Sequence, residues 1–362
     1  MRRVLAGLGL AGMLCSAAGP AQAAWPEQYA DVETWPAWGV YGERLDEETY
    51  AAYGGDLTEA VWFELMVGDP PVGHPTAPRT FRPYDTITRA EFATVLARAL
   101  GIDRQTGLGP DWFWPTVQAL QEAGIITTGG NYREPITRRE MGDWVGRALE
   151  WYGVDLAGKP ELHFSDLSGL PEAPYIRLAT QADVIKGYPD GTYGPERTAT
   201  RAEAAVMALR LAKQLKKDPP GPEVFEQHFR DYWAVVTEIE KEVAEGKPYN
   251  HSYLLEPYMS DMMLYGHGGY DVETRFFYSF RPLQDYLELV DLTVRPIMMR
   301  DTIAVVEITR TTRTVGLDGD EIGSGSSSAY YYFAKRNGRW IGTNTNVERS
   351  LNGYPPVGGT PE

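Results

Sequence analysis

Cysteine is almost missing from this sequence, which holds one cysteine, Cys15, among 362 residues. A single cysteine cannot form an intramolecular disulfide, so the class of small secreted domains held together by disulfides is excluded. Long apolar runs are scarce as well. Beyond residue 24, no stretch approaches the roughly 20 consecutive apolar residues that a membrane-spanning helix needs. We therefore expect a protein that does not span a membrane.

Basic residues are also in short supply, with 34 Lys and Arg against 50 Asp and Glu and a formal net charge of −16. General nucleic-acid binding relies on a broad positive surface, so this composition argues against it. An anionic polymer could be bound only through a few local arginines. Apolar residues make up 43% of the chain and include ten Trp and 22 Tyr. That is enough for sizeable cores, and the length predicts two or more domains.

The first 24 residues have the pattern of a secretory signal peptide. Arg2 and Arg3 precede an apolar run, and Ala21-Gln22-Ala23 provides small residues for cleavage near Ala23 or Ala24. Leu14 stands before Cys15, where a lipoprotein would need a small residue, so we expect the general secretory route. The only cysteine then leaves with the signal peptide.

A four-residue pattern, Thr-Arg-x-Glu, occurs three times, at residues 88–91, 137–140 and 200–203. A Thr followed three residues later by Glu forms a capping box, in which each side chain binds the backbone amide of the other residue. We therefore predict helix caps at three Thr–Glu pairs: Thr88 and Glu91, Thr137 and Glu140, and Thr200 and Glu203. The apolar positions that follow each copy are spaced as one helix face. They are Phe92, Val95, Leu96, Ala99 and Leu100; Met141, Trp144, Val145, Ala148 and Leu149; and Ala204, Met207, Ala208, Leu211 and Ala212.

Helix capping does not explain the arginine in each copy, which is Arg89, Arg138 or Arg201. A guanidinium beside a helix N-terminus is suited to hold a carboxylate or phosphate. The alternative is that each arginine is a solvated or locally paired surface residue. If the arginines are ligands, Arg201→Ala should weaken ligand binding and leave the melting temperature nearly unchanged, whereas Thr200→Ala should cost about 1 kcal/mol of stability.

The third copy has the fullest surroundings. Phe164-Ser165-Asp166 precedes a helical stretch, then Gly187-Tyr188-Pro189-Asp190-Gly191-Thr192-Tyr193 forms a turn, and the Thr-Arg-x-Glu pattern follows. This order resembles the S-layer homology (SLH) domain, and three copies in tandem resemble its usual arrangement. The resemblance covers roughly residues 29–215.

The resemblance implies a mainly α, pseudo-threefold helical bundle that binds secondary cell-wall polysaccharide, often one carrying a pyruvate ketal. It also implies that Arg89, Arg138 and Arg201 contribute to the grooves that hold the acidic sugar. The second copy departs most from the family pattern, because Arg139 stands where Ala is common and the turn before Thr137 is shorter.

The sequence after the third copy differs in kind. A helical apolar stripe runs from Phe225 to Val243, and strand-like runs follow at residues 289–297, 302–315, 326–336 and 339–347. Asn337-Gly338 between two of these runs predicts a hairpin turn. We expect an α+β domain with helices packed on a curved antiparallel sheet. The predicted division is a signal peptide (1–24), repeat 1 with an insertion (25–105), repeat 2 (106–158), repeat 3 (159–217), a linker (218–222), the α+β domain (223–350) and a flexible tail (351–362).

The element order of residues 223–350 resembles the nuclear-transport-factor-like (SnoaL-like) cone fold, whose members often enclose a pocket and include enzymes. Candidate pocket residues are His251, His267, Asp261 and Asp285, with Tyr253, Tyr258 and Tyr278 as walls. Their spacing forms neither a metal signature nor a nucleophile signature, so we assign no catalytic residue, metal or cofactor.

Two functions remain open from the sequence. The first is a non-enzymatic cell-surface protein, anchored non-covalently to an anionic secondary cell-wall polysaccharide and displaying a C-terminal binding or assembly module. The second is a wall-anchored enzyme with its active site in the C-terminal domain. An acidic or histidine cluster at the mouth of a closed pocket would favour the enzyme, and a pocket packed shut by Tyr and Trp would favour the first function.

Overall fold

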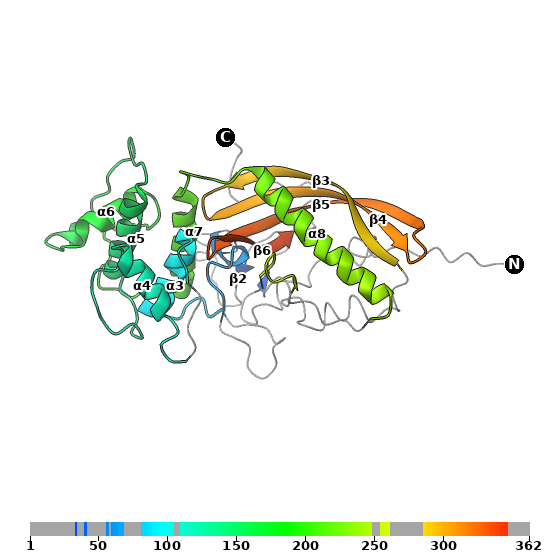
Figure 1. The fold of residues 1–362 in the computed structure, drawn as a ribbon. Coiled ribbons are helices and arrows are strands. Elements are labelled where there is room, and N and C mark those ends of the chain that lie inside the picture. The colour runs from blue at the N-terminus through cyan, green and yellow to red at the C-terminus, as the bar shows by residue number, and fades with distance from the viewer. Residues whose placement is uncertain are drawn as a thin grey trace.

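The computed structural model of the chain describes residues 33–34, 40–41, 56–57, 59–68, 81–104, 109–247, 254–260 and 285–346 (Figure 1). The expected signal peptide, most of the inserted stretch in the first repeat and the expected tail lie outside these residues. The N-terminal part is helical and is preceded by two short paired strands. Its elements are β1 (Glu33–Thr34), β2 (Val40–Tyr41), α3 (Arg89–Leu100), α4 (Trp114–Glu122), α5 (Arg138–Tyr152), the 3-10 helix η1 (Ser165–Leu167), α6 (Ala173–Gln181) and α7 (Arg201–Gln214).

Helices α3, α5 and α7 begin directly after the three predicted threonine caps. All the apolar positions predicted for their inner faces are buried. Helices α3 and α5 end at Gly101 and Gly153, whose positive φ angles of 67° and 72° suit glycine. Helix α4 starts with Pro at its first turn, as α6 does. Trp114, at the start of α4, is 44% exposed.

The Phe-x-Asp segment ahead of α6 holds the turn that leads to α7. The Asp166 carboxylate accepts hydrogen bonds from the amides of Tyr193 (2.9 Å) and Gly194 (2.8 Å). The Phe164 ring lies so close to Gly187 that a Cβ atom there would be 2.0 Å from a ring carbon. The two ends of the motif are therefore bound to each other across the small helix between them.

The C-terminal part is one long helix and a four-stranded antiparallel sheet in the order β3-β4-β5-β6. Its elements are α8 (Pro222–Ala244), β3 (Asp285–Met299), β4 (Ile303–Gly316), β5 (Glu321–Arg336) and β6 (Arg339–Asn346). At the predicted Asn337-Gly338 turn, both residues have positive φ angles, 49° and 79°. This matches the type I′ hairpin that the dipeptide favours.

Helix α8 lies diagonally across one face of the sheet (Figure 1). The stripe predicted from Phe225 to Val243 faces the sheet, where the Phe229 ring meets the Tyr331 ring at 4.5 Å and the Phe225 ring meets the Phe333 ring at 4.7 Å. Because β-strand side chains alternate, Tyr332 points to the opposite face. There its ring lies 4.9 Å from the ring of Trp62.

That opposite face packs against the helical part, so the two parts share one apolar core. Thr302 Oγ1 donates to the Ala99 carbonyl at the end of α3 (2.8 Å), and the Asp301 amide donates to the Leu215 carbonyl after α7 (3.0 Å). The Arg336 guanidinium donates to the Phe63 carbonyl (2.7 Å). The sheet is thus attached to the helices through side-chain packing and through the backbone.

Candidate functional site

The three Thr-Arg-x-Glu copies each form a complete capping box at the start of α3, α5 or α7. In every copy the Thr hydroxyl accepts a hydrogen bond from the Glu amide, and the Glu Oε2 atom accepts one from the Thr amide. The Oε2 distances are 2.8 Å for Thr88–Glu91, 3.0 Å for Thr137–Glu140 and 2.8 Å for Thr200–Glu203. Local sequence alone accounts for this part of the site.

The segments ahead of the three helices meet in a closed ring of backbone hydrogen bonds. The Ile87 amide donates to Ala199, the Ala199 amide to Ile136 and the Ile136 amide to Ile87, with N···O distances of 3.1, 3.4 and 3.0 Å. Each copy therefore contacts both of the others. Local capping does not require this ring, which only the tertiary fold creates.

The first amide of each helix also donates to the neighbouring copy. The acceptors are the carbonyls of Glu134 for Arg89, Arg197 for Arg138 and Asp85 for Arg201. We name these three contacts between copies the Arg89 junction, the Arg138 junction and the Arg201 junction. The amides that a helix N-terminus leaves without intrahelical partners are here occupied by the protein itself. An anion bound at a junction would therefore have to be held by side chains.

Each arginine forms an ion pair with the capping glutamate of the next copy in the ring. The N–O distances are 2.7 Å for Arg89–Glu140, 3.6 Å for Arg138–Glu203 and 2.7 Å for Arg201–Glu91. In each glutamate Oε2 caps its own helix and Oε1 pairs with the arginine of the preceding copy; Arg89 also donates to the capping oxygen of Glu140. The three capping boxes and the three arginines thus form one cyclic network.

Burial separates the three arginines. The side chains of Arg138 and Arg201 are 5% and 3% exposed, whereas that of Arg89 is 18% exposed. Arg138 Nε donates to the Tyr193 carbonyl (3.0 Å), and Arg201 Nε donates to the Phe81 carbonyl (2.7 Å). The interpretation of these two arginines as solvated surface residues is therefore wrong. They hold neighbouring copies together, whatever else they bind.

The Arg89 junction carries the clearest electrostatic perturbation. Arg89 donates to both oxygens of Glu140, at 2.7 and 3.1 Å, and also contacts Glu134 at 3.3 Å. Its hydrogen bond to Glu140 is the largest cause of a raised pKa for Arg89. Burial pushes the pKa of Glu140 upward, but the Arg89 and Thr137 hydrogen bonds outweigh it and leave that pKa below its ordinary value. Both partners stay charged at neutral pH.

The candidate residues of the C-terminal part are described only in part. His251, His267, Asp261, Tyr253 and Tyr278 lie outside the described residues. Asp285 begins β3, and burial raises the pKa of its carboxyl. The Tyr258 ring lies 5.5 Å from the ring of His228 on α8, in an edge contact. Of the candidate pocket residues, Asp285 and Tyr258 are therefore the two that the structure describes.

Sequence reasoning missed Glu240, a carboxylate buried between α8 and β3. Its Oε2 atom accepts a hydrogen bond from the Leu287 amide (2.7 Å), while Thr237 on the same helix donates to the Leu287 carbonyl (2.7 Å). Burial raises the pKa of Glu240 to about 7. A signal was present, because an acidic residue one position after Ile239 falls in the apolar stripe of α8.

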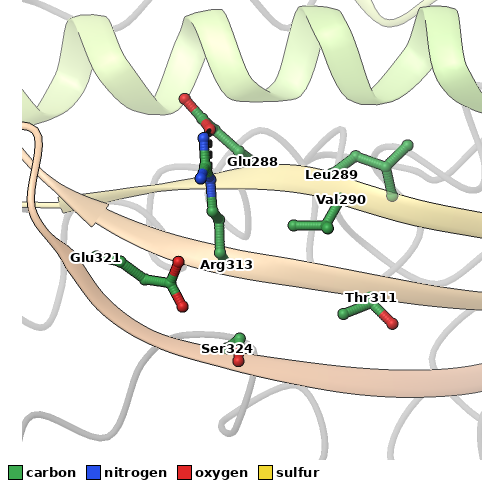
Figure 2. A pocket seen from close by; sticks show the side chains of 7 residues that line it. All are labelled: Glu288, Leu289, Val290, Thr311, Arg313, Glu321 and Ser324. Atoms are coloured by element: carbon green, nitrogen blue, oxygen red, sulfur yellow. Dashed lines mark hydrogen bonds and ion pairs between the residues drawn. The ribbon is translucent and has the colours of Figure 1, made fainter.

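A hollow of about 420 Å³ lies over the outer part of the sheet, on β3, β4 and β5 (Figure 2). Within it the Arg313 guanidinium donates to the Glu288 carboxylate (2.8 Å), so the positive charge there already has a partner. The lining contains neither histidine nor cysteine. Its residues are Glu288, Leu289, Val290, Thr311, Arg313, Glu321 and Ser324.

Neither a metal centre nor a membrane span stands out in the part of the chain that the structure describes. There, no group of three or more His, Cys, Asp or Glu side chains is arranged to hold a metal ion. None of the described helices combines the length and the apolar character that a membrane crossing needs.

Comparison with known proteins bears on the helical part. The family model of the S-layer homology domain matches residues 163–205, which contain η1, α6 and the start of α7. An endoglucanase of Bacillus sp. (strain KSM-635) is 31% identical over 148 residues, which are 38% of this chain and 16% of that protein. The cellulosome-anchoring protein of Acetivibrio thermocellus is 27% identical over 207 residues, 51% of this chain and 43% of that protein.

A third relative is the S-layer protein sap of Bacillus anthracis, 28% identical over 144 residues, 37% of this chain and 18% of that protein. The chain spans less than half the length of each of these relatives. They differ in overall kind, a glucanase, an anchoring protein and an S-layer protein. The similarity therefore concerns a module of the chain rather than a whole protein.

Proposed function

We propose that this chain is an exported cell-surface protein held non-covalently on the cell wall by three S-layer homology repeats. The single observation that carries the proposal is the match of residues 163–205 to the S-layer homology domain. The cell-surface character of two relatives, an S-layer protein and a cellulosome-anchoring protein, supports the same location. The expected signal peptide provides the route of export.

The proposed ligand is an anionic, pyruvylated secondary cell-wall polysaccharide. The three junctions are the proposed binding sites, with Arg89, Arg138 and Arg201 as the residues carried over from the family resemblance. Repetition supports this proposal, because the same motif and the same interlocked hydrogen bonds occur at each junction. A polymer of repeating acidic units is suited to such repeated sites.

The C-terminal part is proposed to be a displayed binding or assembly module rather than an enzyme. The space between α8 and the sheet is filled by aromatic rings in the described residues, which is the packing expected for the first of the two functions. Those rings belong to Phe225, Phe229, Trp233, Tyr331 and Phe333.

The test is co-sedimentation of the full chain with purified sacculi that keep their secondary polymer, against sacculi stripped of that polymer. The full chain is used because the helices and the sheet share a core. We expect binding to intact sacculi and its loss on stripping. Equal binding to both preparations, or binding to neither, would contradict the proposal.

A further inference from the structure

Three residues occupy equivalent places in the ring but do not carry the same charge. The carbonyls of Glu134, Arg197 and Asp85 each accept the first amide of the helix in the adjoining copy, so the backbone fixes their equivalence. Each residue also lies three positions before the Thr cap of its own copy. Two of the junctions thus present an acidic residue at this place, and the Arg138 junction presents an arginine.

Arg197 is exposed, and no described carboxylate lies within ion-pair distance of its guanidinium. Its Cζ atom lies 4.5 Å from the centre of the Tyr188 ring, and the Cζ atom of Arg138 lies 4.9 Å from the same ring. The Tyr188 ring therefore makes cation–π contacts with both guanidinium groups. Asp190, on the turn, is the acidic neighbour whose pKa the charge of Arg197 helps to lower, after the larger effect of Thr192.

The ion pair behind this cluster is also the loosest of the three. Arg138 Nη1 lies 3.6 Å from Glu203 Oε1, whereas the equivalent pairs at the other junctions are 2.7 Å long. Arg138 is over nine-tenths buried, and its Nε and Nη2 atoms donate to backbone carbonyls. Its charge is therefore less completely neutralised by a carboxylate than that of Arg89 or Arg201.

At the other two junctions, no described residue supplies a free cation at the equivalent place. At the Arg89 junction, Arg89 is shared by two carboxylates, Glu140 and Glu134, so negative charge is in excess. At the Arg201 junction, Asp85 is neutralised by Arg82 at 2.6 Å. Among the described residues, the Arg138 junction alone has two arginines, Arg138 and Arg197, for one paired glutamate, Glu203. An acidic ligand is thus attracted to the Arg138 junction, is opposed by the excess negative charge at the Arg89 junction, and meets balanced charges at the Arg201 junction.

We propose that the acidic sugar is bound at the Arg138 junction and that Arg197 selects this junction through its free guanidinium. The inference rests on the proposed wall-binding function and narrows it from three sites to one. Arg197 supplies the accessible donors for a sugar carboxylate, and buried Arg138 supplies positive charge behind them. The second copy departs most from the family pattern, yet it supplies Arg138 to the junction whose charges favour an acidic ligand.

The test measures equilibrium binding of full-length variants to sacculi with their secondary polymer intact. Arg197→Glu gives the Arg138 junction the charge found at the others, and Arg197→Gln removes the charge while keeping a polar side chain. We expect Arg197→Glu to weaken binding at least tenfold and Arg197→Gln several-fold, with melting temperatures near that of the parent chain. The matched control is Arg133→Ala, because Arg133 is an exposed arginine of the second copy that pairs with Asp111. It should bind like the parent chain.

Parent-like binding by Arg197→Glu and Arg197→Gln would overturn the selection of this junction and leave the proposed function standing. Failure of the parent chain to bind intact sacculi would overturn the proposed function and this inference with it. Equal weakening by Arg133→Ala and Arg197→Gln would also overturn it, because it would reveal a general charge effect. The same set of binding measurements distinguishes these three outcomes from one another.

Discussion

At the scale of single residues, the capping glutamates act on two partners at once. Glu91 Oε2 accepts hydrogen bonds from Thr88, and Glu91 Oε1 pairs with Arg201 of another copy. A residue chosen for helix capping thereby also determines which copy lies beside it. The arginine beside each cap belongs to the same network, so we expect it to contribute to the stability of the fold as well as to ligand binding.

The burial of Arg201 changes what its substitution should do. Arg201→Ala removes the hydrogen bonds that Arg201 donates to the Phe81 carbonyl and to Glu91 Oε1, so we expect a loss of about 2–4 kcal/mol of folding free energy. The sequence alone led us to expect a nearly unchanged melting temperature. Thr200→Ala should cost only about 1 kcal/mol through its lost cap. Denaturant unfolding of both variants measures the difference, and equal losses would contradict the structural role of Arg201.

At the scale of elements, α8 is attached to β3 by more than apolar packing. Glu240 and Thr237 bind the amide and the carbonyl of Leu287, so one residue of the strand has both backbone groups held by the helix. This satisfies polar backbone groups at the end strand of the described sheet, where unpaired groups are otherwise costly. It also buries the carboxyl group of Glu240, so the stability of the fold depends on the protonation of that group.

Burial is the main cause that raises the pKa of Glu240 to about 7 from the ordinary 4.5; Asp285 adds to the rise, and the Leu287 hydrogen bond opposes it. Between these two values the folded chain binds more protons than the unfolded chain. Stability from this group is therefore fully present below pH 4.5 and is lost as the pH rises toward 7, by roughly 3 kcal/mol in total. At pH values above this range, Glu240 causes no further change in the free energy of unfolding.

Glu240→Gln keeps an oxygen that can accept from Leu287 and removes the titration. We expect the variant to lack most of the fall in unfolding free energy between pH 4.5 and pH 7, as measured by urea unfolding at several pH values. A smaller fall from Asp285, whose pKa is also raised, should remain in both proteins. An identical pH profile for the two would show that Glu240 titrates normally.

At the scale of the whole molecule, the helices and the sheet share an apolar core. Trp62 and Phe63 pack on Tyr332, and Thr302 binds the end of α3. The linker predicted at residues 218–222 joins parts that are in contact, since the Asp218 amide donates to the Asp301 carboxylate at 3.1 Å. Removal of either part would expose apolar surface that the other now covers.

We therefore expect the full chain to unfold in a single cooperative transition, because separating the two parts would cost a large share of the buried surface. Differential scanning calorimetry and tryptophan fluorescence should report the same midpoint. Two transitions well separated in temperature would indicate that the shared core contributes little to the stability of the folded chain.

The sequence by itself determined the features that are set within a few residues. The Thr–Glu caps, the inner faces of α3, α5 and α7, the stripe of α8 and the Asn337-Gly338 turn all follow from local hydrogen bonding and periodicity. Tertiary structure decided the rest. The closing of the three copies into a ring, and the contact of Arg138 with the same Tyr188 ring that Arg197 contacts, join residues far apart in the chain. The local sequence pattern does not encode these long-range contacts, because a capped helix satisfies that pattern whatever lies beside it.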